Sequence, residues 1–366
     1  MARVGVKAAL VVVVGVAAAV ALGGCANVGY YWQSAAGHLQ MMRASRPVDE
    51  WVGDAATPQR LKERLALSQR IRRFASSELK LPDNPSYTRY ADLHRNAVVW
   101  NVVAAPALSL TLRTWCFPVT GCVGYRGYFA EGDAQAEAGD LRQQGYEAAV
   151  YPVPAYSTLG WMNWAGGDPL LNTFIQYPEG ELARLIFHEL AHQVLYVKND
   201  TMFNESFATA VERLGSRQWL AAQGSDTARQ EFESYAARRA QFRALLQATR
   251  ERLGDIYEKK LPQPLDTDAQ LALKAQALTE FRAEYARLRD SWAVDPARLR
   301  LTDRWVAEAN NASFGAQAAY DELVPGLEAL FEREGRDWPS FYAAARRLGE
   351  LTRAERHQIL KELARA

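Results

Sequence analysis

The feature that most constrains this chain is a short apolar stretch, IFHELAH, at positions 186–192. It holds two of only five histidines in 366 residues, and these two, His188 and His192, flank Glu189 at a spacing of four. Residues four apart lie on one face of a helix, one turn apart. The two imidazoles can therefore bind one metal ion with the glutamate beside it. A buried histidine pair that arose by chance is the alternative interpretation.

The residues around this stretch predict a helix. Apolar side chains recur at helical spacing, with Gly180 and Glu181 near the expected start. The periodic positions are Leu182, Leu185, Ile186, Leu190, Val194 and Leu195. The two histidines should therefore project from a stable helical face.

A catalytic zinc usually has three protein ligands and one open position. Leu195 and Lys198 stand where a longer motif would need Gly and a third His. The available third ligand is Glu205, in FNESFATAVE, on a second helix that should begin near Asn204 and be capped by it. We predict Zn²⁺ on His188, His192 and Glu205, although the same ligands would also hold manganese, cobalt or iron.

Glu212 follows Glu205 by seven residues, two turns along the same helix face. It can hold the free ring N–H of a ligand histidine and so fix the orientation of that imidazole. The alternative is an ordinary carboxylate on the helix surface.

The segment FNESFATAVE resembles the glutamate-ligand helix of the gluzincin zinc peptidases. The matching positions are Asn204, Glu205, Phe207, Ala208 and Glu212, whereas Ser206 replaces a glycine. Only twelve residues separate His192 from Glu205, fewer than those families place there. The connection between the two helices should therefore be tighter than in the gluzincins.

A closer resemblance covers about residues 29–335 and is to a family of bacterial lipoproteins described as predicted aminopeptidases. It rests on YYWQSAAGHL, CFPVTGCVGYRGYF, YSTLGWMNWAGGDPLLNT, IFHELAHQVLYVKNDTMFNESFATAVE and NNASFGAQAAYDELVPGLEALF. The resemblances imply an α+β, predominantly helical fold, with a gluzincin-like zinc peptidase core and a small sheet beside the zinc helix.

The resemblances also imply roles for individual residues. Glu189 would be the general base, and Tyr320 is the best tyrosine candidate for stabilising the oxyanion, with a packed core tyrosine as the alternative. Thr158, Leu159 and Gly160 would form an edge strand that pairs with the substrate backbone, unless they form a structural turn. This stretch lacks the glutamate with which related aminopeptidases hold the substrate amine, so endopeptidase activity stays open.

The N-terminus predicts export. Residues 1–24 have the charged start and apolar stretch of a signal peptide, with an uncleaved anchor helix as the alternative. The ending LGGC resembles a bacterial lipobox, which implies cleavage before Cys25 and lipid on that cysteine. Ala26, where an aspartate would retain the protein at the inner membrane, favours the periplasmic face of the outer membrane. The lipid would anchor the protein to the bilayer.

Two other cysteines, Cys116 and Cys122, occur in CFPVTGC. An even number in an exported chain favours a disulfide. A metal pair is the alternative, but the spacing and the lack of nearby histidines argue against it.

The remaining organisation follows from the sequence pattern. Residues 25–95 predict a helical segment, 96–215 the α+β zinc peptidase core, and 216–366 a helical domain that contributes to the cleft. Helices expected at 227–258 and 268–291 form a hairpin. The formal net charge of +1 argues against nucleic acid as a partner. The oligomeric state is not predicted.

These patterns favour a zinc aminopeptidase that removes N-terminal residues from peptides in the bacterial envelope. The alternatives are a zinc endopeptidase acting on envelope proteins, and a non-catalytic helical scaffold or chaperone with a structural metal. A structural site has no need for a base at Glu189, which argues against the scaffold.

Overall fold

The computed structural model describes residues 29–117, 121–258, 266–317 and 322–365. The chain divides into two compact units, residues 1–45 and 46–366. In the first unit, residues 29–44 form a helix. None of the helices in the described part of the chain is both long enough and apolar enough to span a bilayer. The signal peptide and Cys25 lie outside the described residues.

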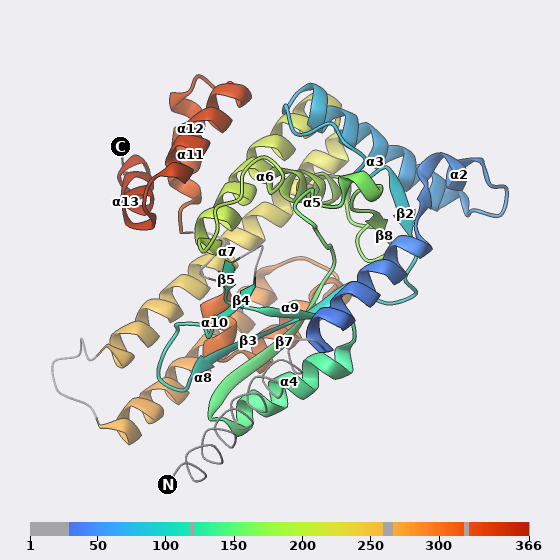
Figure 1. Ribbon diagram of the computed structural model, residues 1–366. Helices are drawn as coiled ribbons and strands as arrows, with labels where there is room; N and C mark the ends of the chain where they lie inside the picture. The colour runs from blue at the N-terminus through green and yellow to red at the C-terminus, as the bar shows by residue number, and fades with distance from the viewer. Residues whose placement is uncertain (1–28, 118–120, 259–265, 318–321, 366) are drawn as a thin grey trace, which may run out of the picture. The chain divides into compact units, whose positions relative to one another are not determined.

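The described residues of the second unit are mainly helical and form three small sheets (Figure 1). The prediction of an α+β, predominantly helical chain is confirmed. Helices that lie outside the largest sheet and the candidate site include α2 (Val48–Gly53), α9 (Arg300–Glu308), α11 (Val324–Arg333), α12 (Trp338–Glu350) and α13 (Arg353–Leu363), with short 3₁₀ turns at Asn163–Ala165 and Pro296–Arg298.

The largest sheet has the order β6-β3-β7. The central strand β3 (Val99–Pro106) pairs antiparallel with β6 (Arg126–Tyr128) and β7 (Tyr146–Val153). β3 is apolar except for Asn101 and almost wholly buried, as a strand covered on both faces should be. Helix α4 (Glu131–Gln143) and helix α10 (Asn311–Gln317) both pack against β3 and β7. The sheet thus joins segments from the middle and the C-terminal half of the chain.

The two smaller sheets consist of strands of two or three residues. β2 (Arg89–Ala91) pairs with β1 (Arg46–Pro47) and β8 (Leu170–Leu171). β4 (Trp115–Phe117) and β5 (Gly121–Val123) form a two-stranded pair, in which a disulfide joins Cys116 to Cys122.

Helices α5 (Glu179–Ala191) and α6 (Thr201–Gln223) lie side by side at the centre of the second unit (Figure 1). Leu182, Ile186 and Leu190 are fully buried along one face of α5. Gly215 of α6 allows the close approach, because a Cβ there would lie 3.1 Å from the Phe187 ring. α3 (Gln59–Ser77) also packs against both helices, so α5 is held on more than one side.

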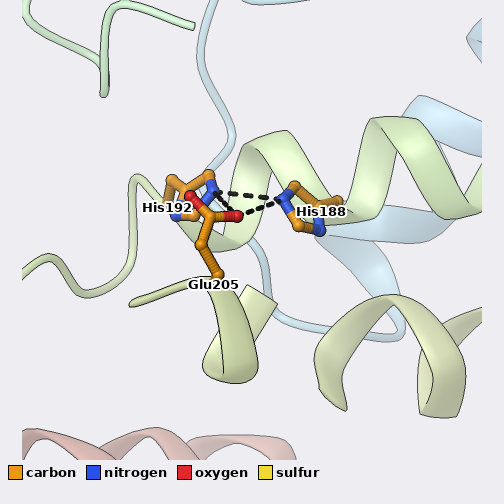
Figure 2. A group of neighbouring side chains, drawn as sticks. All are labelled: His188, His192 and Glu205. Atoms are coloured by element: carbon orange, nitrogen blue, oxygen red, sulfur yellow. Dashed lines mark hydrogen bonds and ion pairs between the residues drawn. The ribbon is translucent and has the colours of Figure 1, made fainter. Parts of the chain in front are cut away.

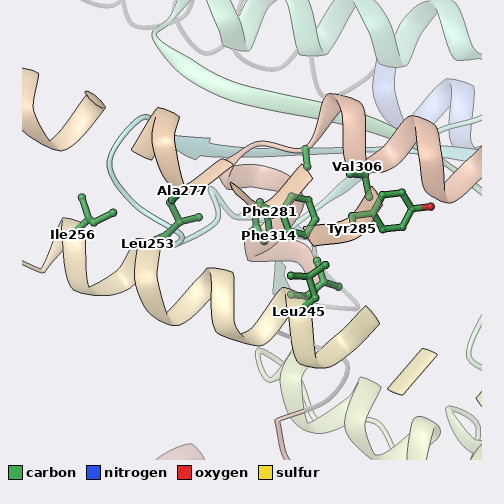
Figure 3. Close-up of a cluster of buried hydrophobic side chains, with 10 residues drawn as sticks. Leu245, Leu253, Ile256, Ala277, Phe281, Tyr285, Val306 and Phe314 are labelled. Atoms are coloured by element: carbon green, nitrogen blue, oxygen red, sulfur yellow. The ribbon is translucent and has the colours of Figure 1, made fainter. Parts of the chain in front are cut away.

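Helices α7 (Asp226–Tyr257) and α8 (Thr267–Ser291) pack against each other close to the predicted ranges. Between them lies the hairpin core, an apolar cluster that includes Phe281 and Leu253 (Figure 3). Phe314 of α10 joins it, with its ring centroid 5.1 Å from that of Phe281. The hairpin core therefore connects α7 and α8 to a helix that covers the sheet.

Candidate metal centre

His188 and His192 project from the C-terminal end of α5, and Glu205 projects from the first turns of α6 (Figure 2). The Nε2 atoms of the two histidines are 3.2 Å apart. The Oε2 atom of Glu205 lies 3.3 Å from Nε2 of His188 and 3.7 Å from Nε2 of His192. The three residues predicted as ligands are thus brought together, with their donor atoms facing one another.

These separations suit a tetrahedral ion. Two donor atoms at about 2.0–2.1 Å from a tetrahedral zinc are about 3.3–3.4 Å apart. The three donor-to-donor distances lie close to that value, and the donor set of two imidazoles and one carboxylate is one that zinc accepts. The residues present therefore fit a zinc ion.

Glu212 lies on the far side of the His188 ring, where its Oε2 is 3.1 Å from Nδ1. An Nδ1–H donating to this carboxylate leaves the Nε2 lone pair directed at Glu205 and His192. Burial opposes ionisation of Glu212, but the charge of Arg184 and the hydrogen bond with His188 lower its pKa to about 2. Glu212 is buried and ionised, so it is not an ordinary surface carboxylate.

The pKa values of the two histidines shift in opposite directions although the residues are neighbours. Burial lowers the pKa of His192 to about 4, which favours the neutral form that binds metals. Burial acts the same way on His188, but hydrogen bonds and charges from Glu205 and Glu212 raise its pKa. Burial also disfavours the charged form of Glu205, yet the two histidines lower its pKa. The negative charge concentrated here would favour a cation between the three side chains.

Glu189 has the properties of a general base. Burial raises its pKa to about 7, the nearby charges of Glu205, Asp168 and Glu212 act in the same direction, and His188 opposes them. A base with a pKa near neutrality both accepts and returns a proton efficiently. Glu189 and His188 also line a pocket of about 430 Å³ between α5, α6 and α7. Glu189 is therefore accessible to a small ligand.

Thr158, Leu159 and Gly160 form part of a turn, and the expected edge strand there is wrong. The backbone N–H and the hydroxyl of Thr158 donate to Asp168, whose carboxylate is fully buried, the latter over 2.8 Å. Leu159 and Gly160 have φ values of 55° and 79°, which no extended strand contains. The turn still lies close to the site, because the charge of Asp168 acts on Glu189.

The start of α6 also differs from the expectation. The side chain of Asp200, not Asn204, caps α6 by accepting from the N–H of Phe203. The Asn204 side chain instead accepts from the N–H of Val197 and donates to its carbonyl, over 2.7 and 2.8 Å. Asn204 therefore closes the connection between the two ligand helices.

Three tyrosines near Glu205 were missed by sequence reasoning. Burial raises the pKa of Tyr125, Tyr151 and Tyr196, and the charge of Glu205 contributes to all three shifts. Tyr125 also feels the charge of Glu189. Tyr196, four residues after His192, carried a weak signal, but nothing local marks Tyr125 or Tyr151. Tyr320 lies outside the described residues.

The arrangement defines a class of site: two histidines and a glutamate from adjacent helices around one point, with a buried carboxylate of raised pKa beside them. Over residues 29–360 the chain matches the family described as "Putative aminopeptidase". The chain belongs to this family, which supports a peptidase role. No curated protein and no solved structure matches it.

Proposed function

We propose that the protein is a zinc-dependent aminopeptidase that removes N-terminal residues from peptides. The observation that carries the proposal is the convergence of His188, His192 and Glu205 at tetrahedral spacing beside Glu189. Family membership supports the peptidase role independently. The metal, when bound, would polarise the scissile carbonyl and favour ionisation of water.

The chain's own residues would supply the proton transfers and the orientation. Glu189 takes a proton from the attacking water and returns it to the leaving amine. Glu212 holds His188 in one tautomer through Nδ1. Tyr125 is a candidate donor to the developing oxyanion, because it is a tyrosine whose pKa is raised by burial and by the charges of Glu205 and Glu189.

We propose that the enzyme acts in the bacterial envelope, where lipid on Cys25 would anchor it to the periplasmic face of the outer membrane. The signal-like residues 1–24 support export, and the disulfide between Cys116 and Cys122 suits an oxidising compartment. Mass spectrometry of the purified chain should find a diacylglycerol thioether on Cys25, and its absence would contradict the anchor.

The activity is tested with matched peptides, one with a free N-terminus and one acetylated, on the full chain in detergent. The Glu189→Gln variant is the control, because it keeps the ligands and removes the base. We expect loss of the first residue from the free peptide only, and a rate at least about 100-fold lower in the variant. Internal cleavage of the acetylated peptide would identify an endopeptidase. Stoichiometric metal without cleavage of either peptide would favour the scaffold.

A further inference from the structure

The helix of the first unit, at residues 29–44, has an exposed apolar face (the dark blue helix in Figure 1). Five exposed apolar residues recur there at helical spacing, so they share one side of the helix. They are Tyr31, Trp32, Ala35, Ala36 and Leu39. The side chain of Trp32 is 74% exposed, and the other two large side chains are 45% and 48% exposed. We call these five residues the apolar face.

The opposite side of the same helix is buried. Gly37 and Met41 lie there, and Met41 is only 1% exposed. The exposure of Trp32 and its neighbours is therefore a property of one face and not of a helix that is bare all round. Single exposed apolar residues are normal on a protein surface, whereas a contiguous group marks a site of contact with a protein or a membrane.

The charge of this segment favours an anionic surface. No aspartate or glutamate occurs between residues 29 and 48. Arg43 is exposed and follows Leu39 by four residues, so it continues the same side of the helix by one turn. An apolar face flanked by basic residues is typical of helices that lie in the interface of a bilayer.

The helix also begins close to the cysteine of the lipobox. Three residues separate Cys25 from Gly29, where the helix starts. Gly29 lies within about 14 Å of Cys25 however these residues are arranged, because an extended chain spans at most about 3.6 Å per residue. The helix itself is about 24 Å long. Lipid on Cys25 would therefore hold the start of the helix at the membrane surface, which favours a bilayer over a second copy of the chain as the occupant of the apolar face.

We infer that the apolar face lies on the membrane, with Tyr31, Trp32 and Leu39 in the interfacial layer and the helix axis along the bilayer surface. The inference rests on the proposed lipid anchor at Cys25. Tryptophan and tyrosine are enriched at this depth because their rings are apolar and each carries one polar group that can bind headgroups or water. Arg43 would contact anionic headgroups. Two membrane contacts, the lipid and the helix, anchor a protein more stably than one.

A fluorescent label on the apolar face tests the inference. Ala36→Cys gives the full chain a thiol for an environment-sensitive fluorophore, because Cys116 and Cys122 are joined in a disulfide and Cys25 would carry lipid. The chain is placed in vesicles of phosphatidylethanolamine and phosphatidylglycerol that contain a nitroxide phospholipid. We expect a nitroxide near the headgroup to quench the label more than one near the end of the acyl chain, because an interfacial helix is buried by only about 5–10 Å.

Two outcomes of this measurement would overturn the inference. Stronger quenching by the deep nitroxide would mean that the segment enters the hydrocarbon core. An unquenched label whose emission still reports an apolar environment would mean that a second copy or another protein surface covers the apolar face. An unquenched label in a polar environment would mean that the face is in water.

A charged variant shows whether these side chains cause the quenching. Trp32→Glu combined with Leu39→Glu should remove most of it, because burying a carboxylate in the interface is costly. Both residues are exposed, so the fold should tolerate the change. Leu301→Glu is the matched control, because Leu301 is a leucine of α9 that is 73% exposed. Equal loss of quenching in the control, or no loss in the double variant, would overturn the assignment to this face.

Mass spectrometry separates this inference from the proposed anchor. Lipid on Cys25 together with an unquenched label would overturn the inference and leave the anchor standing. A chain without lipid on Cys25 would contradict the anchor. The same vesicles added to that chain would still decide the inference, since quenching supports membrane contact by the apolar face and its absence overturns it.

Discussion

The metal centre and the hairpin core are two buried regions of one unit, built from opposite kinds of side chain. The metal centre buries histidines and carboxylates that satisfy one another. The hairpin core buries aromatic and aliphatic groups (Figure 3). Burying paired charges rarely stabilises a fold, whereas burying apolar surface does. The difference teaches that the hairpin core contributes stability, whereas stability does not explain the buried charges of the candidate metal centre.

The largest effect is expected for a variant of the candidate metal centre, which should lose metal affinity. A variant there that changed only the free energy of unfolding would contradict the comparison. Glu205→Ala removes one of the three proposed ligands, so we expect metal affinity to fall by more than the roughly 10- to 100-fold typical of outer-shell changes. Competition with a chelator measures this. Glu280→Ala, which removes from α8 a partly exposed carboxylate that pairs with Arg252, is the control. Full metal affinity in Glu205→Ala would reject Glu205 as a ligand.

The hairpin core should respond in the opposite way. Phe281 is 1% exposed, so Phe281→Ala should lower the free energy of unfolding by about 3–5 kcal/mol and leave metal affinity unchanged. Urea denaturation measures the stability. Leu271→Ala is the control on the same helix, because Leu271 is 40% exposed and its truncation should cost about 0.5 kcal/mol or less. A loss of metal affinity in Phe281→Ala would show that the two regions are coupled.

Asp200 is a third kind of buried residue, because it is charged like the candidate metal centre but contributes to stability like the hairpin core. It caps α6 and accepts from Arg356 and His357 of α13. Burial raises its pKa, but His357, the Phe203 N–H and Arg356 lower it below the usual range. The carboxylate therefore stabilises the fold above the unfolded pKa of about 4, and this contribution is lost as the pH falls through the lower folded value.

Asp200→Asn should lower the free energy of unfolding by about 3 kcal/mol at neutral pH, because it leaves the charge of the buried Arg356 without its carboxylate partner. It should also remove part of the acid-dependent loss, measured by thermal unfolding between pH 3 and pH 7. Asp226→Asn, at an exposed carboxylate near the start of α7, is the control. Identical pH profiles for Asp200→Asn and wild type would contradict this account.

The smallest effect is expected at Glu212. Gln at this position still accepts from Nδ1 of His188 but carries no charge, so metal affinity should weaken by about tenfold. Glu233→Gln, on the surface of α7, is the comparison variant. Unchanged metal affinity in Glu212→Gln would mean that the charge of Glu212 serves to pair with Arg184 and does not support metal binding through His188.

The sequence predicts the features that depend only on residues close together in the chain. The four-residue spacing and the apolar periodicity of α5, and the ranges of α7 and α8, follow from repeating patterns in neighbouring residues. The residue that caps α6 could not be predicted in this way, because KNDTMFN contains two candidates, Asp200 and Asn204. Arg356 and His357, which lie far along the chain, bind only Asp200. The turn at Thr158 likewise depends on the buried Asp168, and Tyr125 reaches the site only after β6 has paired with β3.

The connection between His192 and Glu205 is held from several directions. Gln193 contacts Asn84, Asn199 accepts from the N–H of Cys122 in the disulfide-linked pair, and Asp200 binds α13. A Cβ at Gly121 would lie 2.3 Å from the Asn199 side chain, so even a methyl group there would collide. Surface connections usually tolerate insertions and deletions during evolution. This one should keep its length across the family, because one added residue would disturb three distant segments together with the second ligand helix.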